Sequence, residues 1–158
     1  IRFFTVYGPW GRPDMAPMIF TKSILDGEKI KLFNNGDMYR DFTYIDDVVE
    51  NLYRLVKKPA KPNEEFNLSK PVYSSSWAPY QILNLGNSES VKLLEFINCL
   101  EEVLDKEALK QFLPMQDGDV KATLSSSLAI EKITGFKPKT KLKDGLYSFV
   151  KWYKEYYK

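Results

Sequence analysis

The first sixteen residues constrain the fold more than any other part of this 158-residue chain. An apolar stretch over residues 1–6 runs into a loop of glycines and prolines over residues 7–13. A nearly continuous apolar run is typical of a strand buried on both faces of a sheet. The loop carries one arginine, Arg12, and ends at Asp14, a good N-cap for a helix. A buried strand leading into such a loop predicts a binding cleft, and we expect the chain to be a piece of a larger protein.

Strands and helices are expected to alternate along the rest of the chain. Short apolar or alternating runs predict strands over residues 30–33, 40–44, 81–85 and 109–112. Helical spacing of apolar residues predicts helices over residues 14–26 and 46–57, after residue 88, over 127–133 and from about residue 140. The proline-containing stretch 59–79 is predicted to be an ordered surface excursion. This alternation predicts an α/β fold.

Composition excludes several classes of protein. Lys and Arg (23) nearly balance Asp and Glu (21), so the chain lacks the basic stripe of a nucleic-acid binder. It has no histidine, the usual metal ligand and the usual general base near neutral pH. Its single cysteine, Cys99, excludes an internal disulfide and fits a reducing compartment. No segment has the apolar length of a membrane span. We therefore expect a cytoplasmic protein without a metal site and without nucleic-acid or membrane partners.

Four ordered stretches resemble a known family, the NAD-dependent nucleotide-sugar epimerases and dehydratases of the extended short-chain dehydrogenase/reductase group. The stretches span residues 2–16, 36–49, 82–87 and 114–120, and they cover nearly the whole chain. The opening run most resembles the UDP-glucuronate 4-epimerases. The resemblance implies an α/β chain that forms the C-terminal part of a Rossmann-like fold.

Two motifs of this family are absent from the chain. There is no Gly-x-x-Gly-x-x-Gly turn for a dinucleotide and no Tyr-x-x-x-Lys pair for catalysis. The resemblance therefore implies that residues 1–158 are the substrate-binding portion. Residues 1–6, 45–57 and 80–86 are expected to pack in or against the Rossmann sheet of a missing N-terminal half, which would hold most of the NAD. No catalytic residue is assigned to this chain, and alone it is expected to be inactive.

Three charged residues are the main site candidates that the resemblance implies. Arg12 would face the C5 carboxylate of glucuronic acid, and Arg40 would neutralise the UDP diphosphate. Asp119 would accept hydrogen bonds from the ribose hydroxyls. The structural alternatives are a solvated Arg12 or an Arg12–Asp14 pair, an ion pair of Arg40 with Asp37 or Asp41, and an Asp119 that only closes a turn.

The remaining candidates are weaker and also follow from the resemblance. They are Thr5 against the sugar, the helix-start amides of Met15 and Ala16 at the diphosphate, the main chain of Lys31 and the ring of Phe33 at the uracil, Gln116 at a second phosphate-binding position, and the backbone near Phe3 at the nicotinamide amide. A helix start suits an anion because its first N–H groups are unpaired and its dipole is positive there. Ordinary structural roles are the alternatives for each.

The activity implied is interconversion of UDP-glucuronate and UDP-galacturonate through an NAD-bound 4-keto intermediate, in carbohydrate metabolism and surface polysaccharide biosynthesis. Two alternatives stay open. One is a related nucleotide-sugar dehydratase or UDP-glucuronate decarboxylase, and the other is a non-catalytic nucleotide-sugar-binding module. A homodimer is common in this family but has no signature in this sequence.

Overall fold

The computed structural model describes residues 1–157. Its strands are β1 (Arg2–Phe3), β2 (Thr5–Tyr7), β3 (Lys29–Leu32), β4 (Tyr39–Tyr44), β5 (Asn84–Leu85), β6 (Ser90–Lys92) and β7 (Leu109–Phe112). Its helices are α1 (Ala16–Asp26), α2 (Ile45–Val56), α3 (Leu93–Leu104), α4 (Leu128–Thr134) and α5 (Leu142–Tyr156), with a 3-10 turn η1 (Phe33–Gly36). The alternation of strands and helices confirms the predicted α/β class.

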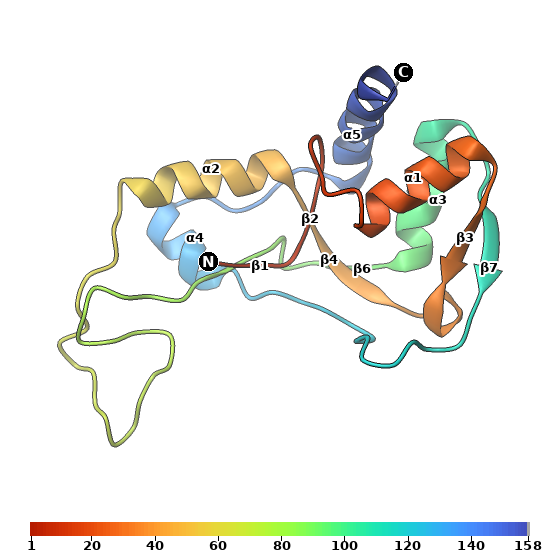
Figure 1. Ribbon diagram of the computed structural model, residues 1–158. Helices are drawn as coiled ribbons and strands as arrows, with labels where there is room; N and C mark the ends of the chain where they lie inside the picture. The colour runs from red at the N-terminus through yellow and green to blue at the C-terminus, as the bar shows by residue number, and fades with distance from the viewer. Residues whose placement is uncertain (158) are drawn as a thin grey trace.

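The strands form three small sheets around a central strand, β4 (Figure 1). β4 lies between β2, which is parallel to it, and β6, which is antiparallel. β3 pairs in parallel with β7, and β1 pairs in parallel with β5. Tyr7 at the end of β2 lies opposite Tyr44 at the end of β4, so the loop after β2 begins beside the start of α2.

The main core is formed where α3 and α5 pack against β2 and β4. The rings of Phe42 and Phe96 are stacked with their centroids 4.2 Å apart. Tyr7 meets both rings edge-on, at 6.2 and 6.3 Å. Such aromatic pairs stabilise a fold by about 0.5–1.5 kcal/mol each beyond the area they bury. Cys99 packs against this cluster, and burial raises the pKa of its thiol, as expected for a core cysteine.

The prediction that residues 1–6 form one strand buried on both faces is wrong for the described chain. The stretch is broken at Phe4 into β1 and β2, and Phe3 is 51 % exposed. The reason is that β1 pairs with β5 alone, in a two-stranded sheet, so nothing in residues 1–157 covers its outer face. α2 also exposes apolar side chains, among them Val49 and Val56. That a missing Rossmann half covers these groups stays a prediction.

Two helix starts differ from the predictions. α1 begins at Ala16 with Met15 as its N-cap, because Asp14 pairs with Arg12 instead of capping the helix. α2 begins at Ile45, so Asp46 lies in the first turn, where a carboxylate is stabilised by the helix dipole. The stretch 59–79 contains no helix or strand and projects from the body as a long loop, as predicted (Figure 1).

Buried tyrosines predict how stability depends on alkaline pH. Tyr7 is 3 % exposed, and burial raises the pKa of its phenol; burial also raises the pKa of Tyr44 and Tyr153. The folded protein therefore keeps these protons at pH values where the unfolded chain, with an ordinary pKa of 10.0, loses them. Stability should be complete below pH 10.0 and fall as the pH rises above it.

Urea unfolding of the full-length protein at a series of pH values from about 8 to 11 tests this expectation. Tyr7→Phe should flatten the alkaline loss, because the variant has no phenol to deprotonate there. The hydrogen bond from the Tyr7 hydroxyl to the Leu142 carbonyl is long, at 3.4 Å, so its loss should matter little at neutral pH. An unchanged alkaline slope in Tyr7→Phe would contradict the prediction.

Candidate functional site

A cavity of about 210 Å³ lies between β2, β3, β4 and α1 and gathers most of the predicted site residues. The predicted residues that line it are Thr5, Met15, Ala16, Lys31, Phe33, Arg40 and Asp119. They come from segments as far apart in sequence as β2 and the loop before α4. The fold therefore brings these residues, which are distant in sequence, to one surface.

Two further hollows adjoin this cavity, because they share lining residues with it. One, of about 400 Å³, shares Met15 and contains Arg12, Phe3 and the loop Gly8–Gly11. The other, of about 590 Å³, shares Lys31, Phe33 and Asp119 with the first cavity and adds Gln116. All ten predicted site residues thus line one run of three hollows, which we call the trough.

Arg40 and Asp119 form an ion pair in the middle of the trough. The Arg40 Nη2 lies 2.8 Å from the Asp119 Oδ1, and the two side chains are 19 % and 33 % exposed. The Arg40 Nη1 also donates to the carbonyl oxygens of Tyr39 (2.9 Å) and Lys121 (3.3 Å). A guanidinium has five N–H groups, so the three hydrogen bonds found within residues 1–157 fix its plane and leave donors for an anion.

The structural alternatives considered for Arg40 name the wrong partners. Asp37 pairs with the Lys121 Nζ at 2.6 Å. Asp41 is fully buried and faces away from the trough, as expected for consecutive residues of a strand. Its carboxylate accepts hydrogen bonds from the backbone N–H groups of Asn87 (2.7 Å), Ser88 (3.1 Å) and Ser125 (2.9 Å).

Asp41 is thus a structural residue that sequence reasoning considered only as a partner for Arg40. It fastens β4 to the turn after β5 and to the segment before α4. Gly86 packs against the same carboxylate, since a Cβ there would lie 3.0 Å from the Asp41 Oδ2 and 2.4 Å from the Ser125 Oγ. The only sequence signal was an acid at an inward-facing position of a predicted strand.

Arg12 lies at the rim of the trough. Its Nη2 is 3.2 Å from the Asp14 Oδ2, with side chains 73 % and 69 % exposed, and it also donates to the Met15 Sδ at 3.3 Å. The predicted structural alternative, a pair with Asp14, is therefore present. An ion pair this exposed contributes at most about 1 kcal/mol, so it competes weakly with a carboxylate ligand.

The start of α1 offers fewer amides than predicted. The Met15 N–H already donates to the Arg12 carbonyl at 3.1 Å, and Pro17 has no N–H. Ala16 is therefore the residue of this turn whose amide can face an anion. The Met15 side chain instead forms the wall between two hollows of the trough.

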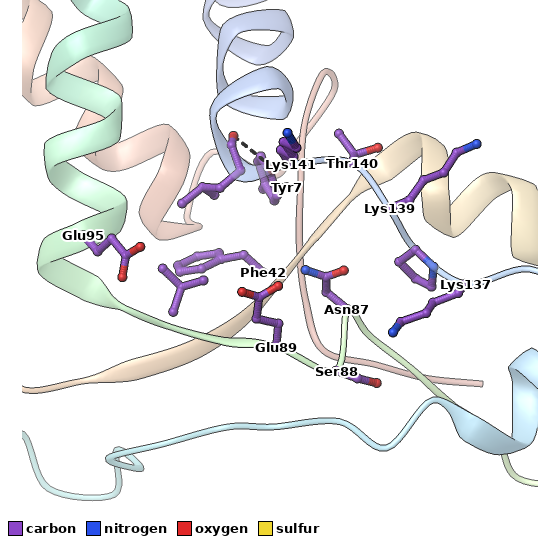
Figure 2. Close-up of a pocket in the computed structure, with 13 residues that line it drawn as sticks. Tyr7, Phe42, Asn87, Ser88, Glu89, Glu95, Lys137, Lys139, Thr140 and Lys141 are labelled. Carbon is purple, nitrogen blue, oxygen red and sulfur yellow. Dashed lines mark hydrogen bonds between the residues drawn. The ribbon is translucent and has the colours of Figure 1, made fainter.

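Another cavity, of about 510 Å³, shares Phe42 and Tyr7 with two hollows of the trough but is lined by none of the predicted residues (Figure 2). Tyr7 and Phe42 form its floor, and loops 87–89 and 137–142 form its walls. Lys137 and Lys139 lie on the side opposite Glu89 and Glu95 (Figure 2). These charged side chains have mixed signs, and no ion pair joins the two walls within the described chain. We therefore regard the trough, and not this cavity, as the candidate site.

Within residues 1–157 no group of three or more acidic, cysteine or histidine side chains is placed to hold a metal ion. None of the helices described there has both the length and the apolar character needed to cross a membrane.

Comparison with known proteins shows which family this chain is similar to. Residues 1–69 match the family model described as NAD dependent epimerase/dehydratase family. The whole chain is 51 % identical to Protein CapI of Staphylococcus aureus and covers 47 % of that protein. Over 99 % of its length it is 42 % identical to a probable UDP-glucuronate 4-epimerase of Rhizobium meliloti, and it covers 46 % of that protein. The chain spans about half the length of the curated relatives that it matches.

A solved structure gives the same result for the fold. The crystal structure of UDP-glucuronic acid 4-epimerase from Bacillus cereus, in complex with UDP-glucuronic acid and NAD, matches 99 % of this chain with a TM-score of 0.80 and 30 % identity. The match covers 45 % of the Bacillus chain. The resemblance stated on the sequence is thereby confirmed, as is the fold of the C-terminal portion of such epimerases and dehydratases.

Proposed function

From the premise that this chain is related to the NAD-dependent epimerases and dehydratases of nucleotide sugars, we propose that it forms the substrate-binding part of a UDP-glucuronate 4-epimerase. The observation that carries the proposal is the placement of Arg12 and Arg40 in adjoining hollows that share Met15. UDP-glucuronate has two anionic groups, a diphosphate and a carboxylate, separated by a hexose ring. Two permanently charged guanidinium groups in neighbouring hollows suit that pattern.

The parts of the ligand are assigned to the trough from the uracil end to the sugar end. The uracil lies against the ring of Phe33 and the main chain of Lys31, and Gln116 lies near the phosphates. The diphosphate lies between Arg40 and the amide of Ala16. The sugar extends past Thr5 toward Arg12, whose fork binds the carboxylate with two parallel hydrogen bonds.

The Arg40–Asp119 pair supports this arrangement without having to break. Its salt bridge uses the Oδ1 of Asp119, which also accepts the Val120 N–H at 2.8 Å. The Oδ2 atom is available to accept from ribose hydroxyls, while Arg40 directs its other N–H groups at a phosphate. A preformed pair lowers the entropy lost when the ligand binds, because both side chains are already ordered.

One hollow of the trough suits the nicotinamide end of NAD. The hollow beside Phe3, Phe4, Val6 and Ile45 is lined mainly by apolar atoms and is wide enough for a nicotinamide ring. The chain has no glycine-rich turn for the pyrophosphate, so the rest of the cofactor must be held outside residues 1–158. When bound, NAD would supply the hydride acceptor for the sugar C4. The residues of this chain hold the nucleotide, orient the sugar and supply none of the proton transfers.

Arg12 also helps to distinguish an epimerase from the alternative enzymes, a dehydratase and a decarboxylase. A carboxylate-binding arginine suits an epimerase or a decarboxylase that acts on UDP-glucuronate, whereas a dehydratase of a neutral hexose has no use for it. The epimerase is favoured over the decarboxylase by the 42 % identity to the Rhizobium protein and the 30 % identity to the Bacillus enzyme. A homodimer and a cytoplasmic location stay predictions of the family resemblance.

The proposal is tested by incubating the full-length protein with NAD and UDP-glucuronate and identifying the products by proton NMR. We expect UDP-galacturonate to accumulate until the two epimers reach equilibrium, with no net change in NADH absorbance. Release of carbon dioxide and a UDP-pentose would instead identify a decarboxylase. Binding of UDP-glucuronate without any conversion would identify a non-catalytic binding module.

A further inference from the structure

Trp10 has a backbone conformation that is unusual for its side chain. Its φ of 63° lies in the left-handed region, which a bulky residue adopts only when surrounding contacts impose it. Its side chain is nevertheless 73 % exposed, so burial in a core is not what holds it. Some other contact must keep Trp10 in place.

That contact comes from the last turns of α5. The Trp10 ring lies 5.5 Å from the ring of Trp152 and 5.1 Å from the ring of Tyr156, measured between centroids. Trp152 and Tyr156 are themselves stacked at 5.3 Å with an interplanar angle of 21°. Figure 1 shows the loop after β2 rising beside α5. We call these three residues the aromatic clasp.

The first turn of α5 packs against the other end of the same loop. Tyr7, the last residue of β2, donates a hydrogen bond from its hydroxyl to the Leu142 carbonyl. Gly145 allows this close approach, because a Cβ there would lie 2.2 Å from the Tyr7 hydroxyl oxygen. One helix therefore packs against residues 7 and 10, on both sides of Gly8 and Pro9, through the close approach of Gly145 to Tyr7 and the ring contacts of Trp10.

The loop between these contacts is tightly constrained. Gly8 has a φ of 140°, and a Cβ on it would lie 2.4 Å from the Ile45 side chain. Arg12 follows Trp10 by two residues, and its own ion pair with Asp14 is highly exposed. The position of the Arg12 backbone is therefore determined more by the clasp at Trp10 than by any contact of the Arg12 side chain.

We propose that the aromatic clasp of Trp10, Trp152 and Tyr156 positions Arg12 for the carboxylate of the sugar. This inference rests on the proposed function, since it assigns the clasp to the carboxylate end of the same site. The three aromatic residues are positioning residues, because they act through Arg12. Trp152 and Tyr156 line none of the three hollows, and Trp10 lines only the outer one, beside Arg12. They determine selectivity for an acidic sugar over the bare nucleotide.

The test compares two ligands in the full-length protein. Titration calorimetry should show that Trp10→Ala raises the Kd for UDP-glucuronate by about tenfold while changing the Kd for UDP by less than about twofold. Tyr156→Ala should also weaken the binding of UDP-glucuronate more than that of UDP. Trp10→Phe should keep part of the affinity for UDP-glucuronate that Trp10→Ala loses. Tyr147→Ala is the matched control, because Tyr147 is an exposed aromatic residue of the same helix with no ring contact to Trp10.

A double-mutant cycle separates positioning from general support of the fold. If the clasp acts through Arg12, Trp10→Ala should have no further effect on the UDP-glucuronate Kd once Arg12 has been replaced by alanine. Additive effects, equal weakening of both ligands, or unchanged affinities in Trp10→Ala would each overturn the inference. A wild-type protein that binds neither UDP nor UDP-glucuronate would overturn the proposed function itself.

Discussion

Replacing Arg40 with alanine is expected to weaken the binding of UDP to the full-length protein by about 10- to 100-fold. A hydrogen bond to a charged group contributes about 1.5–3 kcal/mol, and each 1.4 kcal/mol corresponds to a factor of ten in Kd. The variant also leaves Asp119 without its ion-pair partner, at 33 % exposure, beside an anionic ligand. Both effects act in the same direction. Isothermal titration with UDP measures the loss directly.

Arg40→Lys and Lys121→Ala complete this experiment. Lysine keeps the charge but loses the planar fork, so its effect should lie between those of arginine and alanine. Lys121→Ala removes one positive charge close to Arg40, but that side chain is 61 % exposed and pairs with Asp37 outside the trough. It should leave UDP affinity nearly unchanged. Equal losses in Arg40→Ala and Lys121→Ala would indicate only a long-range effect of net charge.

Replacing Asp41 with asparagine is expected to lower the free energy of unfolding by about 1–3 kcal/mol, because that is the cost of leaving a buried donor without a partner. Asparagine has almost the same shape, but its NH₂ group cannot accept the backbone N–H groups that the two carboxylate oxygens now accept. Asp41 is fully buried, and at least one of the amides of Asn87, Ser88 and Ser125 would lose its partner; the hydrogen bond from Ser125 is itself buried. Urea unfolding, with the thermal midpoint as a second measure, tests this.

Asp37→Asn is the control for the Asp41 variant. It makes the same chemical change four residues earlier in the chain, at a side chain that is 53 % exposed. Water replaces its hydrogen bonds, so little change in stability is expected. A loss in Asp41→Asn that is no larger than the small change in Asp37→Asn would show that the amides now bonded to Asp41 find other partners.

The elements that local pattern specifies were predicted well. The strand over residues 109–112 has the predicted bounds, and the strand at 30–33 is shifted by one residue, to Lys29–Leu32. α1 and α4 end at Gly27 and Gly135, which adopt the left-handed conformation that glycine favours at this position. In these places the residue types and their spacing suffice to favour one conformation.

Other strands could not be predicted from local sequence, because they depend on pairing with distant segments. β6, Ser90–Lys92, was not predicted because three residues with one apolar side chain carry no periodicity. It is a strand because β4 offers an antiparallel edge to it. The predicted strand over residues 81–85 is reduced to Asn84–Leu85, because only those residues lie opposite β1. Strand pairing is a relation between distant segments, so the sequence of one segment cannot determine it.

The same division applies to the site. The sequence alone determined which residue types were available for an anionic, hydroxyl-rich ligand, because arginine, an acid and a helix start have fixed charge and hydrogen-bonding capacity. Only the tertiary structure decided that Arg40 pairs with Asp119 and not with Asp37 or Asp41, and that Trp10 rests on α5. Local sequence sets the chemistry and conformational preference of each residue. Contacts between residues separated by 79 or more positions depend on how β4, α5 and the loop before α4 pack together.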